Sequence, residues 1–212
     1  MRISKPNRSH FLLSLIGALL LSVSINATTL SYESHSVSGV TPITTTILHD
    51  KGEIIITEKS THHFQKFICR LDYSVKRWEY QNKQQRISFI AYSDGKTITI
   101  NGQINALEIT KSISQNNLPW YQSARYAFPY FQKHLSRETP FSFLQFKPNN
   151  PNIVVTVLRF SKQDPLKATV RHKGFLGLFS KIHYTLKENG YVQKEIIATN
   201  PRIETILTRV SD

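Results

Sequence analysis

The sequence predicts a mainly β protein of about ten to twelve short antiparallel strands, with one short kinked helical segment. Runs of alternating apolar and polar residues recur along most of the chain, with a clear example at Phe64–Tyr73. Turn pairs such as Asp94-Gly95 and Asn189-Gly190 separate neighbouring runs and suit the positive φ angles of tight hairpin turns. Because these connections are too short for parallel pairing, the sheet is expected to be antiparallel.

The first half of the chain supplies the longer series of expected strands. They cover residues 28–40, 43–48, 53–59, 64–73, 75–80, 87–92, 97–100 and 107–113. In the 64–73 strand, the alternation places Phe67, Cys69, Leu71 and Tyr73 on the core face. The 87–92 strand carries apolar residues on both faces, which indicates a strand covered on both sides.

A helical period interrupts the strands at residues 119–135. Trp120, Ala124, Phe128 and Phe131 recur at spacings of three and four, which is the signature of a helix with one apolar face. Pro129 lies within this stretch and favours two short helical turns or one kinked helix. We expect its aromatic face to pack against the sheet.

The remaining chain returns to strands and shows no linker. The expected strands cover residues 141–146, 153–160, 166–172, 182–186, 191–199 and 203–210. Residues 28–212 are therefore interpreted as a single domain of sandwich or barrel type.

The N-terminus has the parts of a secretory signal peptide. Three basic residues, Arg2, Lys5 and Arg8, precede the uncharged apolar run Phe11–Ile25. This run is 15 residues long, whereas a bilayer span needs about 20. We expect residues 1–27 to be removed, with cleavage after Ser24 and an uncleaved anchor as alternatives. The protein is then exported, to the periplasm or, in a host without an outer membrane, to the exterior.

The charge balance favours anionic partners over cationic ones. The chain has 27 Lys and Arg against 14 Asp and Glu, and three of the basic residues lie in the signal region. A basic exported protein meets lipid head groups and envelope polymers rather than nucleic acid, although the same surplus also serves simple solubility. After residue 27, no segment is long and apolar enough to span a membrane.

Most catalytic and metal-binding patterns are absent. The chain has no G-x-S-x-G, no H-E-x-x-H, no phosphate-binding glycine loop and no Rossmann pattern. His62 and His63 are neighbours and point to opposite faces of a strand, while His172 and His183 lie on separate strands with no acidic ligand nearby. The acidic residues fall mostly in turns or at polar strand positions, and no two of them can be paired from sequence. We therefore expect no catalytic residue, no metal, no cofactor and no enzymatic activity.

The layout resembles an uncharacterised family of bacterial exported β proteins, known as a domain of unknown function. The resemblance rests on DGKTITINGQ, LPWYQ, an aromatic helix, FKPNN and GFLGLFSKIHYTLKENGYVQKEI. More distantly, the layout is similar to the open half-barrels of the LolA/LolB lipoprotein carriers. The resemblance implies a strongly curved antiparallel sheet whose concave side is capped or filled by the helical element. It implies no activity.

Aromatic residues are the distinctive feature of the composition. They either build the core of a curved sheet or line an apolar cleft with a basic rim. The candidates for the cleft are Trp78, Tyr80, Phe89, Trp120, Tyr121, Tyr126, Phe128, Phe131, Phe175 and Phe179. Arg77, Arg86 and Arg125 are the candidates for the rim, because an Arg can hold a carboxylate or phosphate with two hydrogen bonds.

Two functions fit these features. The first is an exported binding or carrier protein that takes an apolar or lipid-like ligand in a concave cleft. The alternative is a structural or assembly factor of the envelope that binds a protein or an anionic polymer.

Overall fold

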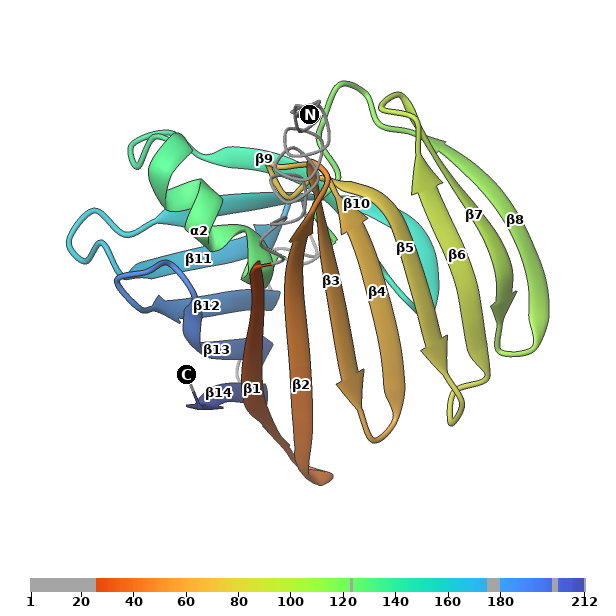
Figure 1. The fold of residues 1–212 in the computed structure, drawn as a ribbon, viewed down its shortest axis with the longest axis horizontal. Coiled ribbons are helices and arrows are strands. Elements are labelled where there is room, and N and C mark those ends of the chain that lie inside the picture. The colour runs from red at the N-terminus through yellow and green to blue at the C-terminus, as the bar shows by residue number, and fades with distance from the viewer. Residues whose placement is uncertain (1–25, 123, 175–179, 200–201, 212) are drawn as a thin grey trace, which may run out of the picture.

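The computed structural model describes residues 26–122, 124–174, 180–199 and 202–211, and these form one large antiparallel sheet (Figure 1). Its fourteen strands are β1 (Asn26–Ser36), β2 (Gly39–Asp50), β3 (Glu53–Ser60), β4 (His63–Cys69), β5 (Val75–Asn82), β6 (Ile87–Ser93), β7 (Thr97–Ile104), β8 (Leu107–Ser114), β9 (Phe141–Lys147), β10 (Asn150–Phe160), β11 (Lys167–His172), β12 (Ser180–Leu186), β13 (Val192–Thr199) and β14 (Arg202–Ser211). The helix α2 spans Ala124–His134. The prediction of a mainly β, antiparallel fold is confirmed, but the strand number of ten to twelve was too low. The fourteen ranges expected from the sequence each correspond to one observed strand, so the stated total was too low but the placement of the strands was right.

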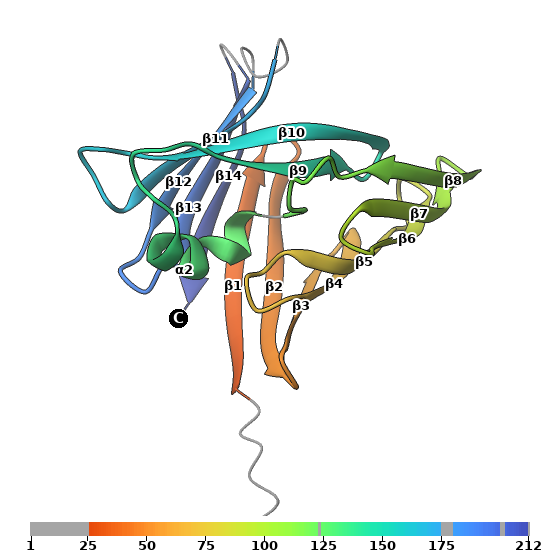
Figure 2. The same ribbon diagram turned by 90° about the horizontal axis from the view of Figure 1, so that it is seen from above.

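The strand order follows the chain except at one place. Neighbours run from β8 back to β1, then from β14 back to β9, so the first strand pairs with the last. The sheet curves strongly without closing into a barrel, and β8 and β9 remain its two edges. Figure 2 shows β9 and β10 passing across the molecule toward β8, where Lys111 donates a hydrogen bond of 2.8 Å to the side-chain oxygen of Asn152.

One face of the sheet carries the core and the other faces outward. Along β6 the buried residues are Ile87, Phe89 and Ala91, whereas Ile90 and Tyr92 are exposed by 41% and 47%. The prediction that this strand is covered on both sides was therefore wrong, because apolar residues here occupy a solvated face of an antiparallel sheet.

The β4 strand ends earlier than its alternation predicted. It stops at Cys69, and residues 70–74 form a turn in which Tyr73 has a φ of 66°. Cys69 is buried at 1% exposure, as predicted. Leu71 is 61% exposed, which corrects its placement on the core face, because the turn breaks the two-residue period.

The helix α2 lies on the core face of the sheet. Ala124, Ala127, Phe128 and Phe131 are each at most 1% exposed, so the predicted apolar face packs inward. Pro129 lies inside the helix. No helix among the described residues combines the length and the apolar character that crossing a bilayer requires.

The segment before α2 forms backbone hydrogen bonds both with the edge strand β9 and with β5. Pro119 and Tyr121 exchange backbone hydrogen bonds of 2.9 and 3.1 Å with Leu144 of β9, and the carbonyl of Trp120 accepts one of 2.8 Å from Val75 at the start of β5. The Leu118-Pro119-Trp120-Tyr121 stretch thus covers part of the β9 edge and leads the chain into α2.

Candidate functional site: a charged cavity beneath the helix

A cavity of about 390 Å³ lies on the core face, next to the start of α2. Its apolar lining includes Phe67, Trp78 and Ile182, and its charged lining consists of Glu58, Arg125 and Glu195, together with the titratable His63. The volume falls within the range of about 300–1,000 Å³ that is usual for small-ligand sites. Apolar walls with a few polar groups gathered together are typical of such sites.

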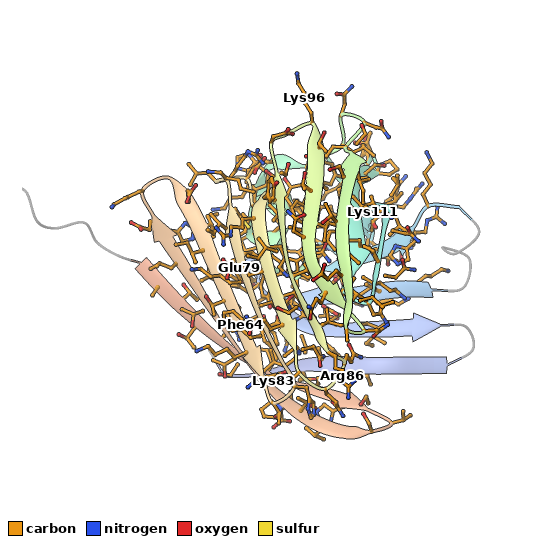
Figure 3. All side chains as sticks on the ribbon, turned by 90° about the vertical axis from the view of Figure 1, so that its right-hand side faces the viewer. Phe64, Glu79, Lys83, Arg86, Lys96 and Lys111 are labelled. Atoms are coloured by element: carbon orange, nitrogen blue, oxygen red, sulfur yellow. The ribbon has the colours of Figure 1, made fainter. Side chains whose placement is uncertain are left out.

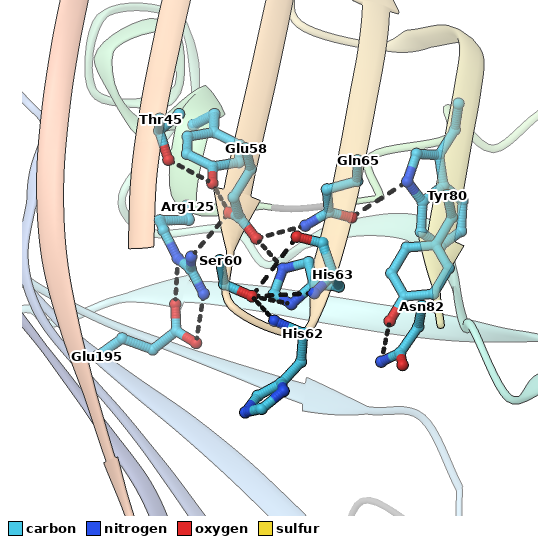
Figure 4. A network of polar contacts seen from close by, with 12 residues as sticks. Thr45, Glu58, Ser60, His62, His63, Gln65, Tyr80, Asn82, Arg125 and Glu195 are labelled. Carbon is cyan, nitrogen blue, oxygen red and sulfur yellow. Dashed lines mark hydrogen bonds and ion pairs between the residues drawn. The ribbon is translucent and has the colours of Figure 1, made fainter. Parts of the chain in front are cut away.

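Arg125 of α2 joins two distant parts of the sheet at this cavity (Figure 4). Its Nε and one terminal nitrogen donate to the two carboxylate oxygens of Glu195 on β13, at 2.9 and 3.2 Å. Its other terminal nitrogen donates to Glu58 on β3 at 3.2 Å. The planar guanidinium suits this arrangement, because its donors form a rigid fork that a lysine lacks.

The Glu58 carboxylate has donors on both oxygens. One oxygen accepts from Nε2 of His63 at 2.8 Å and from the side-chain amide of Gln65 at 2.6 Å. The other accepts from Arg125 and from the hydroxyl of Tyr126. Burial by itself raises the pKa of Glu58, but the hydrogen bond from His63 and the charge of Arg125 outweigh burial and hold this pKa below its ordinary value. Glu58 is therefore ionised at neutral pH.

The same burial keeps the surrounding groups in one protonation state. Burial lowers the pKa of Arg125, but Glu195 and Glu58 more than compensate and place it above the ordinary value. Burial raises the pKa of Tyr184 well above its ordinary value, and that of Tyr32 to about 12. The guanidinium is thus charged and both phenols are neutral across the physiological range.

A Ser–His–Glu chain of hydrogen bonds runs along one side of the cavity. The Ser60 hydroxyl lies 2.8 Å from Nδ1 of His63, whose Nε2 contacts Glu58. The Ser60 oxygen also accepts backbone hydrogen bonds from His62 and His63, at 3.2 and 3.1 Å. Through these bonds Ser60 orders the β3–β4 turn.

Three of the predicted site residues line the cavity, namely Trp78, Tyr80 and Arg125. The other predicted aromatic residues with described side chains are buried in the core and do not line the cavity: Phe89, Trp120, Tyr121, Tyr126, Phe128 and Phe131. Their rings pack on one another, as between Tyr121 and Phe131, whose ring centroids are 5.0 Å apart. Phe175 and Phe179 lie outside the described residues.

The three predicted rim arginines do not come together. Arg77 is exposed on the outward face of β5 and pairs with Glu79 at 3.1 Å. Arg86 is exposed at the β5–β6 turn, near Lys83 (Figure 3). Arg125 is the only one of the three at the cavity, and its charge is directed at two carboxylates instead of at an open rim.

Sequence reasoning missed the acidic half of this site. Glu58 and Glu195 are 3% and 4% exposed, so these two are exceptions to the expectation that the acidic residues fall mostly in turns or at polar strand positions. His63 likewise is part of the network and not a free turn residue. A signal for Glu58 was present, because it continues the buried alternation of Ile54 and Ile56 on β3. The inward position of Glu195 follows from its cross-strand pairing with Tyr184. No local pattern in the sequence reveals this pairing.

The histidines form no metal centre with the acidic residues in the described parts of the chain. His172 contacts Thr156 at 3.3 Å and His183 contacts Thr169 at 3.4 Å, so they do not meet. Burial, with a contribution from Lys147, lowers the pKa of His172.

Fold and site together define a mainly β protein with a curved open sheet around one helix and a ligand-sized cavity. No family model and no curated protein matches the sequence. Among solved structures, the chain is similar to a β-barrel-like protein of the domain of unknown function DUF1849 from Brucella abortus. The TM-score is 0.56 at 7% identity, over 88% of this chain and 96% of that one. The likeness supports the resemblance to an uncharacterised β-protein domain at the level of the fold.

Proposed function

We propose that this chain is an exported binding or carrier protein that holds a small amphiphile in the cavity beside α2. The observation that carries the proposal is the composition of the cavity, which sets apolar walls against one buried group of charges. Such a cavity suits a ligand with an apolar body and one polar end. The distant resemblance of the sequence layout to the LolA/LolB half-barrels, which are carriers, favours the same class by analogy alone.

Binding rather than catalysis is supported by the state of the charged groups. General acid–base catalysis needs a group that can give up and regain a proton near neutral pH. Glu58 is held ionised, and both oxygens of Glu195 are engaged by Arg125. Glycoside hydrolysis in particular needs one carboxyl to donate a proton while its partner acts as base or nucleophile. Glu58 and Glu195 are both held by the guanidinium of Arg125, so they are poorly suited to that proton transfer.

Export to the envelope completes the proposal. It is supported by the basic residues and the apolar run at the N-terminus, which have the order of a signal peptide. An exported carrier of this kind handles lipids or other amphiphiles that the aqueous compartment does not dissolve well.

The test is to fill the cavity from one wall. Ile197 lines the cavity and is half-buried, so Ile197→Trp should occupy its volume. The matched control is Ile90→Trp, which adds the same side chain to the outward face of β6. Binding is measured by titration with a fluorescent fatty acid, and co-purified ligand by native mass spectrometry.

We expect the wild type and Ile90→Trp to bind the probe alike, and Ile197→Trp to lose at least about tenfold in affinity through steric exclusion. Equal binding by all three proteins, or a wild type that carries no ligand and binds no probe, would overturn the proposal. Thermal unfolding of each variant checks that the fold is retained.

A further inference from the structure

The face of the sheet opposite α2 carries an unbalanced group of basic side chains on β10–β13. On these strands Tyr184 and Glu195 are a directly opposed pair, and Glu195 contacts Arg125 of the helix. On β10 and β11 the buried Leu158, Phe160 and Val170 mark the same inward side, and the residues that alternate with these inward positions point outward. They include Arg159, Arg171, Lys181 and Lys194, all of them exposed, which we call the basic patch.

The basic patch has no acidic counterpart among the described side chains of these strands. The outward positions between its members are held by neutral residues, including Thr169, Thr185 and Ala198. Nearby, Asp164 in the β10–β11 loop pairs with Lys167 at 3.0 Å, so its charge is already matched. The four members of the basic patch thus face solvent as uncompensated charges.

The outward face at the other end of the chain is built differently. There Glu53 forms an ion pair with Lys76, and Glu79 pairs with Arg77 and lies opposite Lys66. Opposite charges alternate across β3, β4 and β5. The surplus of positive charge is therefore concentrated on one part of the outward surface and is not a uniform property of it.

Within the basic patch, two like charges are directly opposed. Arg171 on β11 and Lys181 on β12 are cross-strand partners. Such neighbours have Cβ atoms about 4.5–5.5 Å apart, and like charges at that spacing repel. Arg159 lies opposite Thr169, and so is a diagonal neighbour of Arg171. An anionic surface laid over these side chains would relieve the repulsion.

We propose that the basic patch is a docking surface for a membrane containing anionic phospholipids. Each Lys or Arg near such a surface makes its own favourable contribution to the free energy of membrane binding. This additive attraction suits charges that are spread over four strands of a sheet. A nucleic acid fits the same face less well. Sheets that bind single strands stack bases on aromatic side chains, and the described outward residues of β10–β13 include no Phe, Tyr or Trp.

Docking through the basic patch leaves the cavity accessible. The cavity lies on the helix side of the sheet, whereas the basic patch lies on the opposite side of the same strands. The membrane contact therefore holds the protein at a lipid surface without covering Glu58, Arg125 or Glu195. The inference does not depend on what the cavity binds.

The experiment measures sedimentation of the purified protein with vesicles. Phosphatidylcholine vesicles with and without phosphatidylglycerol are compared, at low and at high salt. The variant replaces Arg159, Arg171, Lys181 and Lys194 by Gln. The control replaces Lys51, Lys59, Lys83 and Lys96 by Gln, which removes the same number of exposed charges from turns and strands elsewhere.

We expect the wild type and the control to bind only the anionic vesicles, and to release them at high salt because screening shortens the range of the attraction. The patch variant should lose affinity by at least about 100-fold. Equal losses in both variants would show that net charge alone matters and would overturn the proposal. Binding of a single-stranded oligonucleotide in place of vesicles would also overturn it. An unchanged thermal unfolding curve confirms that each variant is folded.

Discussion

Glu58 on β3 and Glu195 on β13 bind the same guanidinium, although β2, β1 and β14 lie between their strands in the sheet. Both carboxylates are nearly inaccessible, at 3% and 4% exposure. Arg125 therefore fixes the start of α2 to the two halves of the sheet at once. Arg125, Glu58 and Glu195 all line the cavity.

Removing the shared cation should be costly. Arg125→Met leaves two buried carboxylates without their partner, and we expect a loss of about 3–5 kcal/mol in the free energy of unfolding. Arg125→Lys keeps a charge but cannot reach both carboxylates with a rigid fork, so a smaller loss of about 1–3 kcal/mol is expected. Urea unfolding followed by tryptophan fluorescence measures both. The control, Arg77→Met, removes an exposed, paired arginine and should change the free energy of unfolding by less than about 1 kcal/mol. A loss that small in Arg125→Met would contradict the stabilising role of the contacts between Arg125, Glu58 and Glu195.

Glu58 should make the protein more sensitive to acid. Its pKa is lower in the folded protein than in the unfolded chain, so the stabilisation is complete above the ordinary carboxyl range and is lost as the pH falls through the folded value. The contribution of Glu58 to the free energy of unfolding of the wild type should therefore hold from pH 7 down to about pH 5 and should fall below about pH 5. In Glu58→Gln the fall should be shallower, from a lower starting value. Glu108→Gln, which removes an exposed carboxylate on β8, serves as the control. Parallel pH profiles for Glu58→Gln and the wild type would refute this assignment.

The contact between α2 and the β12–β13 turn should depend on a glycine. Gly190 has a φ of 85°, and a Cβ there would lie 2.7 Å from Cα of Pro129. Gly52 has nearly the same φ, 81°, with open space around it. Gly52→Ala should therefore lower the free energy of unfolding by only about 1–2 kcal/mol, which is the cost of placing an alanine in the left-handed conformation. Gly190→Ala should lose about 1–3 kcal/mol more, because backbone has to move. Chemical denaturation of the two variants tests this, and equal losses would show that the helix accommodates the methyl group.

Cys69 should be unreactive in the folded protein. Burial raises the pKa of its thiol to about 12, with a further contribution from the nearby Asp72. Thiolate is the reactive form, so both ionisation and access are suppressed. Ellman's reagent at pH 8 should leave the native protein unmodified and should react fully in denaturant. Rapid reaction with native protein would show that β4 opens readily.

The fold was largely predictable because its signals are local. Asp94-Gly95 and Asn189-Gly190 specify hairpins by their own conformational preferences, and alternation specifies which side chains face inward. Ile90 shows the limit of this reasoning. A half-exposed apolar residue on an outward face looks the same in sequence as one covered by a second layer.

The site was harder to predict because its residues are joined only by the tertiary structure. Arg125 was found as a candidate, but its partners come from strands at opposite ends of the chain. Local alternation marks Glu58 as an inward position, yet nothing local says which cation will meet it. Phe128 was predicted to line a cleft, but its side chain is fully buried and does not line the cavity, so it belongs to the core. Aromatic content alone does not separate these two roles.

The pairing of β1 with β14 also determines the order in which the molecule can be completed. Within β2–β8 and within β9–β13, each strand pairs with strands that are next to it in the sequence. The junction between the two halves can form only when the last strand, β14, is available to pair with the first, β1. Contacts between distant parts of a chain form slowly, and an unpaired strand edge is prone to aggregation in the meantime. Until β14 is available, β1 exposes that edge. Removal of β14 should therefore prevent the two halves of the sheet from joining, even though Glu58 and Arg125 are still present.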